Sequence, residues 1–221
     1  QRLTTMDIDI YLQGSYSNST NIRSESDVDV VVQLNDTFCK DTSHLSSEEI
    51  TAHNEAYDPA TYLFHDFRSD VIKALVSKFG ADIVDITRNK SLGVKANQNR
   101  LNADVLPCLE YREYVYFTSP TDYLSNPGVK FYTQQGNNPI INYPKIHKSN
   151  GEDKNLDNRT RGKFKDLVRI VKNLAVQMAD ERIISKRIAP SYFIECSIYN
   201  VPDDSLSGTY LENLSNATEF L

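Results

Sequence analysis

Residues 13–32 read QGSYSNSTNIRSESDVDVVV, a turn of small residues followed by a strongly β-branched run. Apolar and polar side chains alternate just before it, over residues 8–12, so this region predicts a strand, a turn and a second strand. Because side chains alternate faces along a strand, Asp27 and Asp29 point to one side while the neighbouring valines point to the core. Two adjacent carboxylates repel each other, and a hard divalent cation such as Mg²⁺ removes that repulsion.

Three further residues extend this pattern. Gly14 and Ser15 lie in the predicted turn, where glycine lets backbone approach a ligand and serine donates to phosphate oxygens. Asp104 is a lone acid in an otherwise apolar strand predicted over residues 101–109, where an unpaired charge is costly. A third carboxylate would complete a two-metal site. Taken singly, an Asp-x-Asp pair is common and Asp104 is also typical of an ordinary edge strand.

The first half of the chain predicts an α+β or α/β arrangement. Apolar residues recur at helical spacing over residues 63–79, after a helix start at Asp58-Pro59, and Gly80 ends the run. A further strand is expected over residues 92–96. Residues 114–161 are rich in proline and asparagine and predict a loop-like connection.

A helical half is expected over residues 162–221. Its first helix carries one apolar stripe, formed by Phe164, Leu167, Val168, Val171, Leu174, Ala175 and Met178. Lys165, Arg169 and Lys172 are spaced four and three residues apart, so they are expected to share the opposite face. For Lys165 and Arg169 the alternative is an ordinary solvated charge.

Pro190 predicts the start of another helix, which runs through Ile198. Ser191 then falls in the first turn, where free backbone N–H groups and the helix dipole favour anions. Tyr192 offers a flat face on which a base can stack, although a core aromatic is the alternative.

Charge and composition narrow the function classes. The net charge is −6, which argues against a general nucleic-acid binder, yet twelve of the 24 Lys and Arg residues and only six of the 30 acids lie between Lys145 and Arg187. That concentration fits either a solvated helix face or a patch for a polyanion such as a triphosphate. The three cysteines form neither a metal-spaced pair nor a disulfide framework, which suits a reducing cytoplasm, and no apolar run approaches the roughly 20 residues of a membrane span.

Gly14-Ser15, Asp27-x-Asp29 and Asp104 together resemble the nucleotidyltransferase superfamily of DNA polymerase β, CCA-adding enzymes and oligoadenylate synthases. The string at 13–32 is similar to the cGAS/DncV-like nucleotidyltransferases of bacterial anti-phage (CBASS) systems. The same holds for four later motifs, namely NADVLP at 102–107, NYP at 142–144, GKFKDLVRIVKNL at 162–174 and PSYFIEC at 190–196. The last three of these motifs together resemble the CdnE clade most. The likeness runs from about residue 13 to about residue 204.

The resemblance implies an α+β fold in which a polymerase-β-like catalytic core (1–113), with a mixed sheet and helices, packs on a helical domain (162–221). The active site would lie in the cleft between them, and the connection over 114–161 would contribute to the nucleotide pocket. The family has a helix before the Gly-Ser turn and more helices after PSY, so the chain is expected to be truncated. The cysteines of the animal zinc insertion are missing, so no structural zinc is expected.

The resemblance also implies roles for individual residues. Asp27, Asp29 and Asp104 would bind two Mg²⁺ ions, for which Mn²⁺ can substitute. Residues that would bind the nucleotide are Gly14, Ser15, Asn142, Lys165, Lys172, Ser191 and Tyr192. Among them Asn142 would sit in the base pocket and favour a pyrimidine, where purine-using relatives commonly carry serine; the alternative is a turn asparagine that bonds its own backbone.

The expected function is therefore a cytoplasmic enzyme that joins ribonucleoside triphosphates into a cyclic di- or trinucleotide. UTP would be used, alone or with a purine nucleotide such as ATP, and the product would act on a downstream effector protein. Two alternatives remain open. One is an oligoadenylate-synthase-like or 3′-end RNA nucleotidyltransferase, which the negative charge disfavours because long RNA requires Lys and Arg contacts. The other is a catalytically silent nucleotide-binding module.

Overall fold

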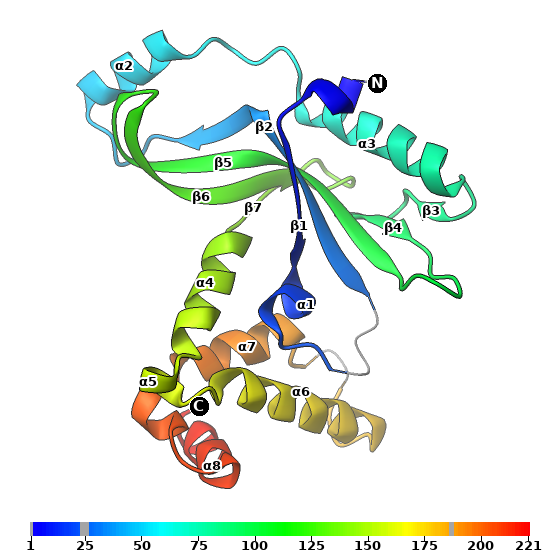
Figure 1. The fold of residues 1–221 in the computed structure, drawn as a ribbon, viewed down its shortest axis with the longest axis vertical. Helices are drawn as coiled ribbons and strands as arrows, with labels where there is room; N and C mark the ends of the chain where they lie inside the picture. The colour runs from blue at the N-terminus through cyan, green and yellow to red at the C-terminus, as the bar shows by residue number, and fades with distance from the viewer. Residues whose placement is uncertain (1, 23–26, 186–187) are drawn as a thin grey trace. The chain divides into compact units, whose positions relative to one another are not determined.

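The computed structural model describes residues 2–22, 27–185 and 188–221 (Figure 1). Contacts divide the chain into two compact units: Gln1–Leu12 with Asp27–Ile146, and Gln13–Ser26 with His147–Leu221. The segment that carries Gly14 and Ser15 thus groups with the helical unit, although it lies between two strands in sequence. This division differs from predicted boundaries at residues 113 and 162, which treated each domain as one continuous stretch.

A mixed seven-stranded sheet forms the centre of the first unit. Its main path is β1 (Ile8–Gln13), β2 (Val28–Asp41), β5 (Ala103–Ser119), β4 (Leu92–Val94) and β3 (Val84–Asp85). Off this path, β6 (Asp122–Tyr132) pairs with β5, and β7 (Pro139–Asn142) pairs with β6. β2 and β5 run parallel, whereas β5 is antiparallel to both β4 and β6. The α+β prediction is confirmed.

The loop-like connection predicted over residues 114–161 is wrong. This stretch contains the end of β5, the strands β6 and β7, α4 (Pro144–Lys154) and α5 (Asp157–Thr160). Pro127 misled the prediction because proline usually interrupts strands. In β6, however, only Val129–Tyr132 pair with β7, so Pro127 lies on an edge where the missing N–H is tolerated.

Apolar side chains cover both faces of the sheet. On one face α3 (Phe64–Phe79) buries Phe67 and Val71 against a cluster that includes Leu34 and Val105, and Figure 1 shows α3 lying along the strands. The other face buries a second cluster of Val31, Leu106, Cys108, Val129 and Phe131. The sheet is therefore a rigid platform for residues at the ends of its strands.

The helix predicted over residues 63–79 is confirmed, and Gly80 ends it with a φ of +93°. Its predicted start at Asp58-Pro59 is wrong, because α3 begins after Leu63, whose N–H donates to Asp66 at 3.0 Å. The short elements that were not foreseen include the 3₁₀ turn η1 (Arg2–Thr5), the strand β3 and the helix α2 (Ser47–Ala56), which a capping box at Ser46 begins.

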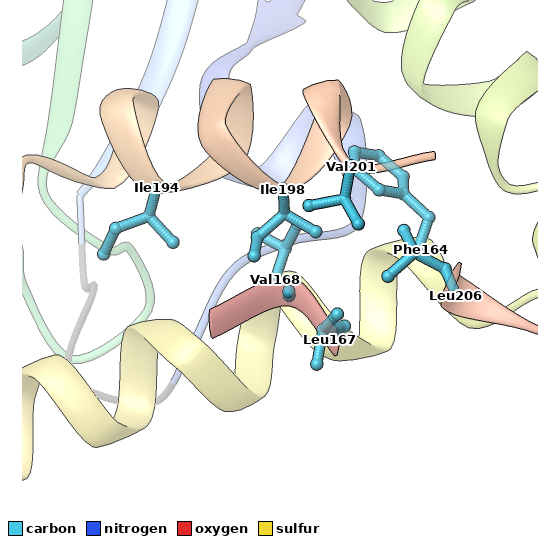
Figure 2. Close-up of a cluster of buried hydrophobic side chains, with 8 residues drawn as sticks. Phe164, Leu167, Val168, Ile194, Ile198, Val201 and Leu206 are labelled. Atoms are coloured by element: carbon cyan, nitrogen blue, oxygen red, sulfur yellow. The ribbon is translucent and has the colours of Figure 1, made fainter. Parts of the chain in front are cut away.

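The second unit is helical. Besides α1 (Gly14–Asn18) and α5, it contains α6 (Phe164–Asp180), α7 (Ser191–Asn200), η2 (Asp203–Leu206) and α8 (Tyr210–Phe220). Figure 2 shows its core, in which side chains of α6 and α7 meet Val201 and Leu206. The predicted stripe of α6 is confirmed for its first turns, but Leu174 and Met178 are 40% and 38% exposed. None of the helices in the described ranges combines the length and apolarity that crossing a membrane needs.

Candidate functional site

The parallel pairing of β2 and β5 places Asp29 directly opposite Asp104. Both side chains are half-buried at the start of their strands, and Asp27 lies exposed one residue before β2 begins. The strand register thus brings Asp29 and Asp104 side by side, and a site that also includes Asp27 stays a prediction. Like charges directly opposite each other destabilise a sheet, so this pair needs a compensating positive charge.

Arg88 supplies such a charge, and sequence reasoning missed it. Its guanidinium forms ion pairs with Asp104 and, at 3.4 Å, with Asp85. Gly93 lies opposite Asp104 on β4, and a Cβ there would come within 2.6 Å of the Arg88 Nε atom. The absence of a side chain at Gly93 therefore leaves the space in which the guanidinium lies.

Asp29 and Asp104 suit a hard divalent cation in donor chemistry, because carboxylate oxygens are the ligands that Mg²⁺ prefers. In the parts of the chain that the structure describes, no three His, Cys, Asp or Glu side chains already converge as a ligand set. The Asp104 carboxylate instead accepts from Arg88. The two strands thus bring the Asp29 and Asp104 carboxylates together. The Arg88 guanidinium pairs with Asp104 and supplies a positive charge that these acids need.

Gly14 and Ser15 begin a short helix, α1, rather than lying in a plain turn. Gly14 has a φ of +64°, a left-handed conformation that glycine adopts without strain, and this lets the chain turn from β1 into the helix. Ser19 ends α1 with a φ of +57°, and the Thr20 N–H donates to the Ser15 carbonyl at 2.9 Å. The predicted turn is therefore a short helix that ends at a left-handed residue, Ser19.

Lys165, Arg169 and Lys172 were expected to share the face of α6 opposite the apolar stripe, and Lys172 on that face is buried, with 2% exposed. Its ammonium donates to the Thr20 carbonyl at 3.1 Å, and Arg169 donates to the Ser19 carbonyl at 2.5 Å. Helical spacing alone cannot show this, because the covering segment is about 150 residues away in sequence. Lys165 is half-buried, and its backbone N–H donates to the Asn155 side chain at 2.9 Å.

Pro190 caps α7, so the predicted helix start is confirmed and Ser191 is its first residue. Tyr192 is 66% exposed, which rules out the alternative of a core aromatic. The His147 ring meets it edge-on, with ring centroids 5.1 Å apart. Lys172 and Ser191 are among the residues that line a pocket of about 430 Å³.

Asn142 is exposed at the end of β7, where it pairs with Val129 of β6. It therefore occupies the end of an edge strand and not the turn that the alternative interpretation supposed. Gly128 on β6 brings backbone close to it, since a Cβ at Gly128 would lie 3.0 Å from the Asn142 carbonyl oxygen.

Residues 149–221 match the family described as the cGAS/DncV-like nucleotidyltransferase C-terminal helical domain. The chain is 46% identical over 197 residues to the cyclic nucleotide synthase CdnE01 of Staphylococcus haemolyticus, a match that covers 89% of this chain and 64% of that protein. It is 38% identical to the cyclic UMP-AMP synthase of Rhodothermus marinus, a match that covers 96% of this chain and 70% of that protein. It is 36% identical to the cyclic dipurine nucleotide synthase of Elizabethkingia meningoseptica, a match that covers 95% of this chain and 69% of that protein.

The solved structure of the Rhodothermus marinus CdnE c-UMP-AMP synthase with Apcpp and Upnpp matches with a TM-score of 0.83 at 38% identity, over 96% of this chain and 69% of that one. The chain thus spans 64% to 70% of the length of these curated relatives. Identity above 30% over more than two thirds of two of them, together with the matching fold, decides the family. The chain belongs to the cGAS/DncV-like nucleotidyltransferase family, and its matches include proteins named CdnE.

Proposed function

We propose that this protein is a cyclic oligonucleotide synthase, which joins ribonucleoside triphosphates by two-metal nucleotidyl transfer and closes the product into a cyclic di- or trinucleotide. The observation that carries the proposal is the register of β2 and β5, which sets Asp29 opposite Asp104 in a chain of this family. Three relatives that are 36% to 46% identical to this chain are named as synthases of cyclic nucleotides.

In this proposal the first unit supplies the acids. Asp27, Asp29 and Asp104 would hold two Mg²⁺ ions, or Mn²⁺ in their place. A bound divalent metal lowers the pKa of a coordinated hydroxyl and neutralises phosphate charge. In the joining reaction the 3′-hydroxyl of one nucleotide would lose its proton to solvent, its oxygen would bond to the α-phosphorus of the next nucleotide, and the bond from that phosphorus to pyrophosphate would break. Arg88, which forms an ion pair with Asp104, offsets the charge of that carboxylate.

The second unit would supply phosphate contacts and, at Tyr192, the ring on which a base stacks. The Ser15 hydroxyl and the N-terminal N–H groups of α1 and α7 are donors for phosphate oxygens, with Ser191 at the start of α7. Lys172 lines the pocket beside Ser191, so we assign it to the triphosphate, with Lys165 as a weaker contributor. We further propose that the product signals to an effector protein in cytoplasmic anti-phage defence.

The proposal is tested by incubating the protein with pairwise mixtures of the four ribonucleotides and Mg²⁺ or Mn²⁺, then identifying products by mass spectrometry after phosphatase treatment. A cyclic product has no terminal phosphate, so a phosphatase-resistant mass is expected. Linear products that phosphatase degrades would indicate an oligoadenylate-synthase-like enzyme. Nucleotide binding without pyrophosphate release would indicate a silent binding module.

Tyr192→Ala should weaken binding of every nucleotide, because base stacking on an aromatic ring is worth about 1–3 kcal/mol. Since the ring is 66% exposed, the melting temperature should stay within error of the parent. Isothermal titration with non-hydrolysable triphosphate analogues measures the loss, and Tyr192→Phe should retain most of the affinity. Unchanged affinity in the alanine variant would remove Tyr192 from the site.

Asn142→Ser should shift nucleotide use from pyrimidines towards purines. An amide presents both a donor and an acceptor, which matches the N3–H and O4 groups of uracil, whereas a serine is shorter and leaves room for a larger ring. The relatives named for UMP-AMP and for dipurine products differ by only two percentage points in identity to this chain, so overall similarity does not decide the base. Product masses from mixed nucleotides check this; a parent that ignores UTP, or a variant with the parent's products, contradicts the assignment.

A further inference from the structure

We propose that Glu195 is a positioning residue that holds the α1 segment, residues 14–20, on the helical unit and so fixes the phosphate-binding end of the site. The inference builds on the proposed function, because that function gives Ser15 and Tyr192 their roles. Glu195 lies on α7, one turn after Tyr192, and is 4% exposed.

Three donors from distant parts of the chain meet the Glu195 carboxylate. Asn18 Nδ2 donates to Oε1 at 2.8 Å, and Thr20 Oγ1 donates to Oε2 at 2.9 Å. His147 Nε2, on α4, lies 3.1 Å from Oε1. Asn18 and Thr20 are themselves buried, with exposed fractions of 5% and 0%.

This network is satisfied only while the α1 segment is docked. Burial by itself raises the pKa of the Glu195 carboxyl, but the hydrogen bonds from His147, Thr20 and Asn18 hold that pKa below its usual range. A buried carboxylate that loses its hydrogen-bond donors destabilises the folded state strongly, because the protein interior does not replace the water that would solvate its charge. The segment is thereby confined to the one position in which Asn18 and Thr20 both reach Glu195.

Two cations of α6 hold the same segment through its backbone. Arg169 donates to the Ser19 carbonyl and Lys172 to the Thr20 carbonyl. Side chains of α6 and α7 therefore contact three consecutive residues, 18–20, at the end of the α1 segment that begins with Gly14 and Ser15. Because α1 has only five residues, fixing its end fixes Ser15 as well.

The same carboxylate also reaches the base-stacking side of the site. His147 contacts Glu195 through Nε2, and its ring meets the edge of Tyr192. Glu195 thus links the two parts of the second unit that we assign to phosphate and to base, although the proposed nucleotide contacts are made by Ser15 and Tyr192 and not by Glu195.

The first test compares Glu195→Ala with Glu195→Gln in steady-state kinetics. The alanine variant should raise KM for every nucleotide by about tenfold or more, because it orphans several buried donors, while kcat changes less. Glutamine should recover most of the loss, since its oxygen can accept from Asn18 and His147 while its N–H₂ donates to the rotatable Thr20 hydroxyl. The exposed acid Glu219, changed to Gln, serves as the matched control and should behave like the parent.

A second readout does not depend on activity. Amide hydrogen exchange of residues 14–20 should accelerate by about tenfold or more in Glu195→Ala, while exchange of β2 and β5 stays at the parent rate. If the alanine variant does not fold, Thr20→Val removes one donor at constant shape and should show the same change to a smaller degree.

The proposal would be overturned if the amide exchange of residues 14–20 and the KM for nucleotides both stayed at the parent values in Glu195→Ala and in Thr20→Val. If the parent uses no nucleotide, the proposed function fails, yet the exchange measurement still decides whether Glu195 anchors the segment. An effect on one base alone would also overturn it, because anchoring of the phosphate end predicts equal losses for all nucleotides.

Discussion

Changing Asp27 and Asp29 together to alanine is expected to reduce nucleotide joining by at least about a thousandfold, since metal ions supply several kcal/mol of transition-state stabilisation. The physical reason lies in the strand register. Asp29 stands opposite Asp104, so its loss leaves one carboxylate, already paired with Arg88, where a metal pair needs several. Release of pyrophosphate from mixed ribonucleotides measures the effect.

The same double variant should fold as well as the parent or better in the absence of divalent ions. Asp27 is exposed, and removing the Asp29 charge relieves repulsion across the β2–β5 pair. Thermal unfolding in a chelator checks this, with Asp122→Asn, an exposed acid of the same unit, as the matched control. Pyrophosphate release at the parent rate in the double variant would show that these acids do not hold the catalytic metal.

Lys172→Ala is expected to raise KM for nucleotides by roughly ten- to a hundredfold, as a lost charge-assisted contact is worth about 1.5–3 kcal/mol. Two effects combine in this change. The ammonium lines the pocket beside Ser191 and also donates to the Thr20 carbonyl, so its loss removes a phosphate partner and loosens the α1 segment. Kinetics over a range of nucleotide concentrations measures the change.

Lys172→Met separates the charge from the packing, because it keeps an unbranched side chain of similar length in a position that is 2% exposed. It should retain the parent's thermal stability better than alanine while still raising KM. Lys165→Ala is the comparison on the same helix and should have the smaller effect on KM. Equal effects of the Lys165 and Lys172 variants would mean that the wrong cation has been assigned to the phosphates.

Periodicity predicted those parts of the fold in which local pattern and burial agree. The β-branched run of β2, the apolar spacing of α3 and the start of α7 at Pro190 all follow from short-range rules, and the structure confirms them. The paired acids of β2 and β5 were also visible, because charged residues inside apolar strands are unusual. That Asp29 and Asp104 lie in register, however, depends on a parallel pairing across 75 residues.

The charged site residues whose surroundings sequence reasoning missed depend on long-range contacts. Arg88 lies in a connection between two short strands, and nothing local marks it as the partner of Asp104. Glu195 looks like an ordinary polar position of α7 until the α1 segment folds onto it. Lys172 has the spacing of a solvated face and is buried for the same reason. Tertiary contact, and not helical period, sets the environment of these three charges.

Whether the acids of β2 and β5 bind two metal ions is tested directly by Mn²⁺ binding followed by electron paramagnetic resonance. With a non-hydrolysable triphosphate present, the parent is expected to bind two Mn²⁺ ions per chain. Asp104→Asn, which keeps the shape of the side chain but removes its charge, should lose at least one of them. Two ions bound with the parent's affinity in Asp104→Asn, or none in the parent, would contradict the account.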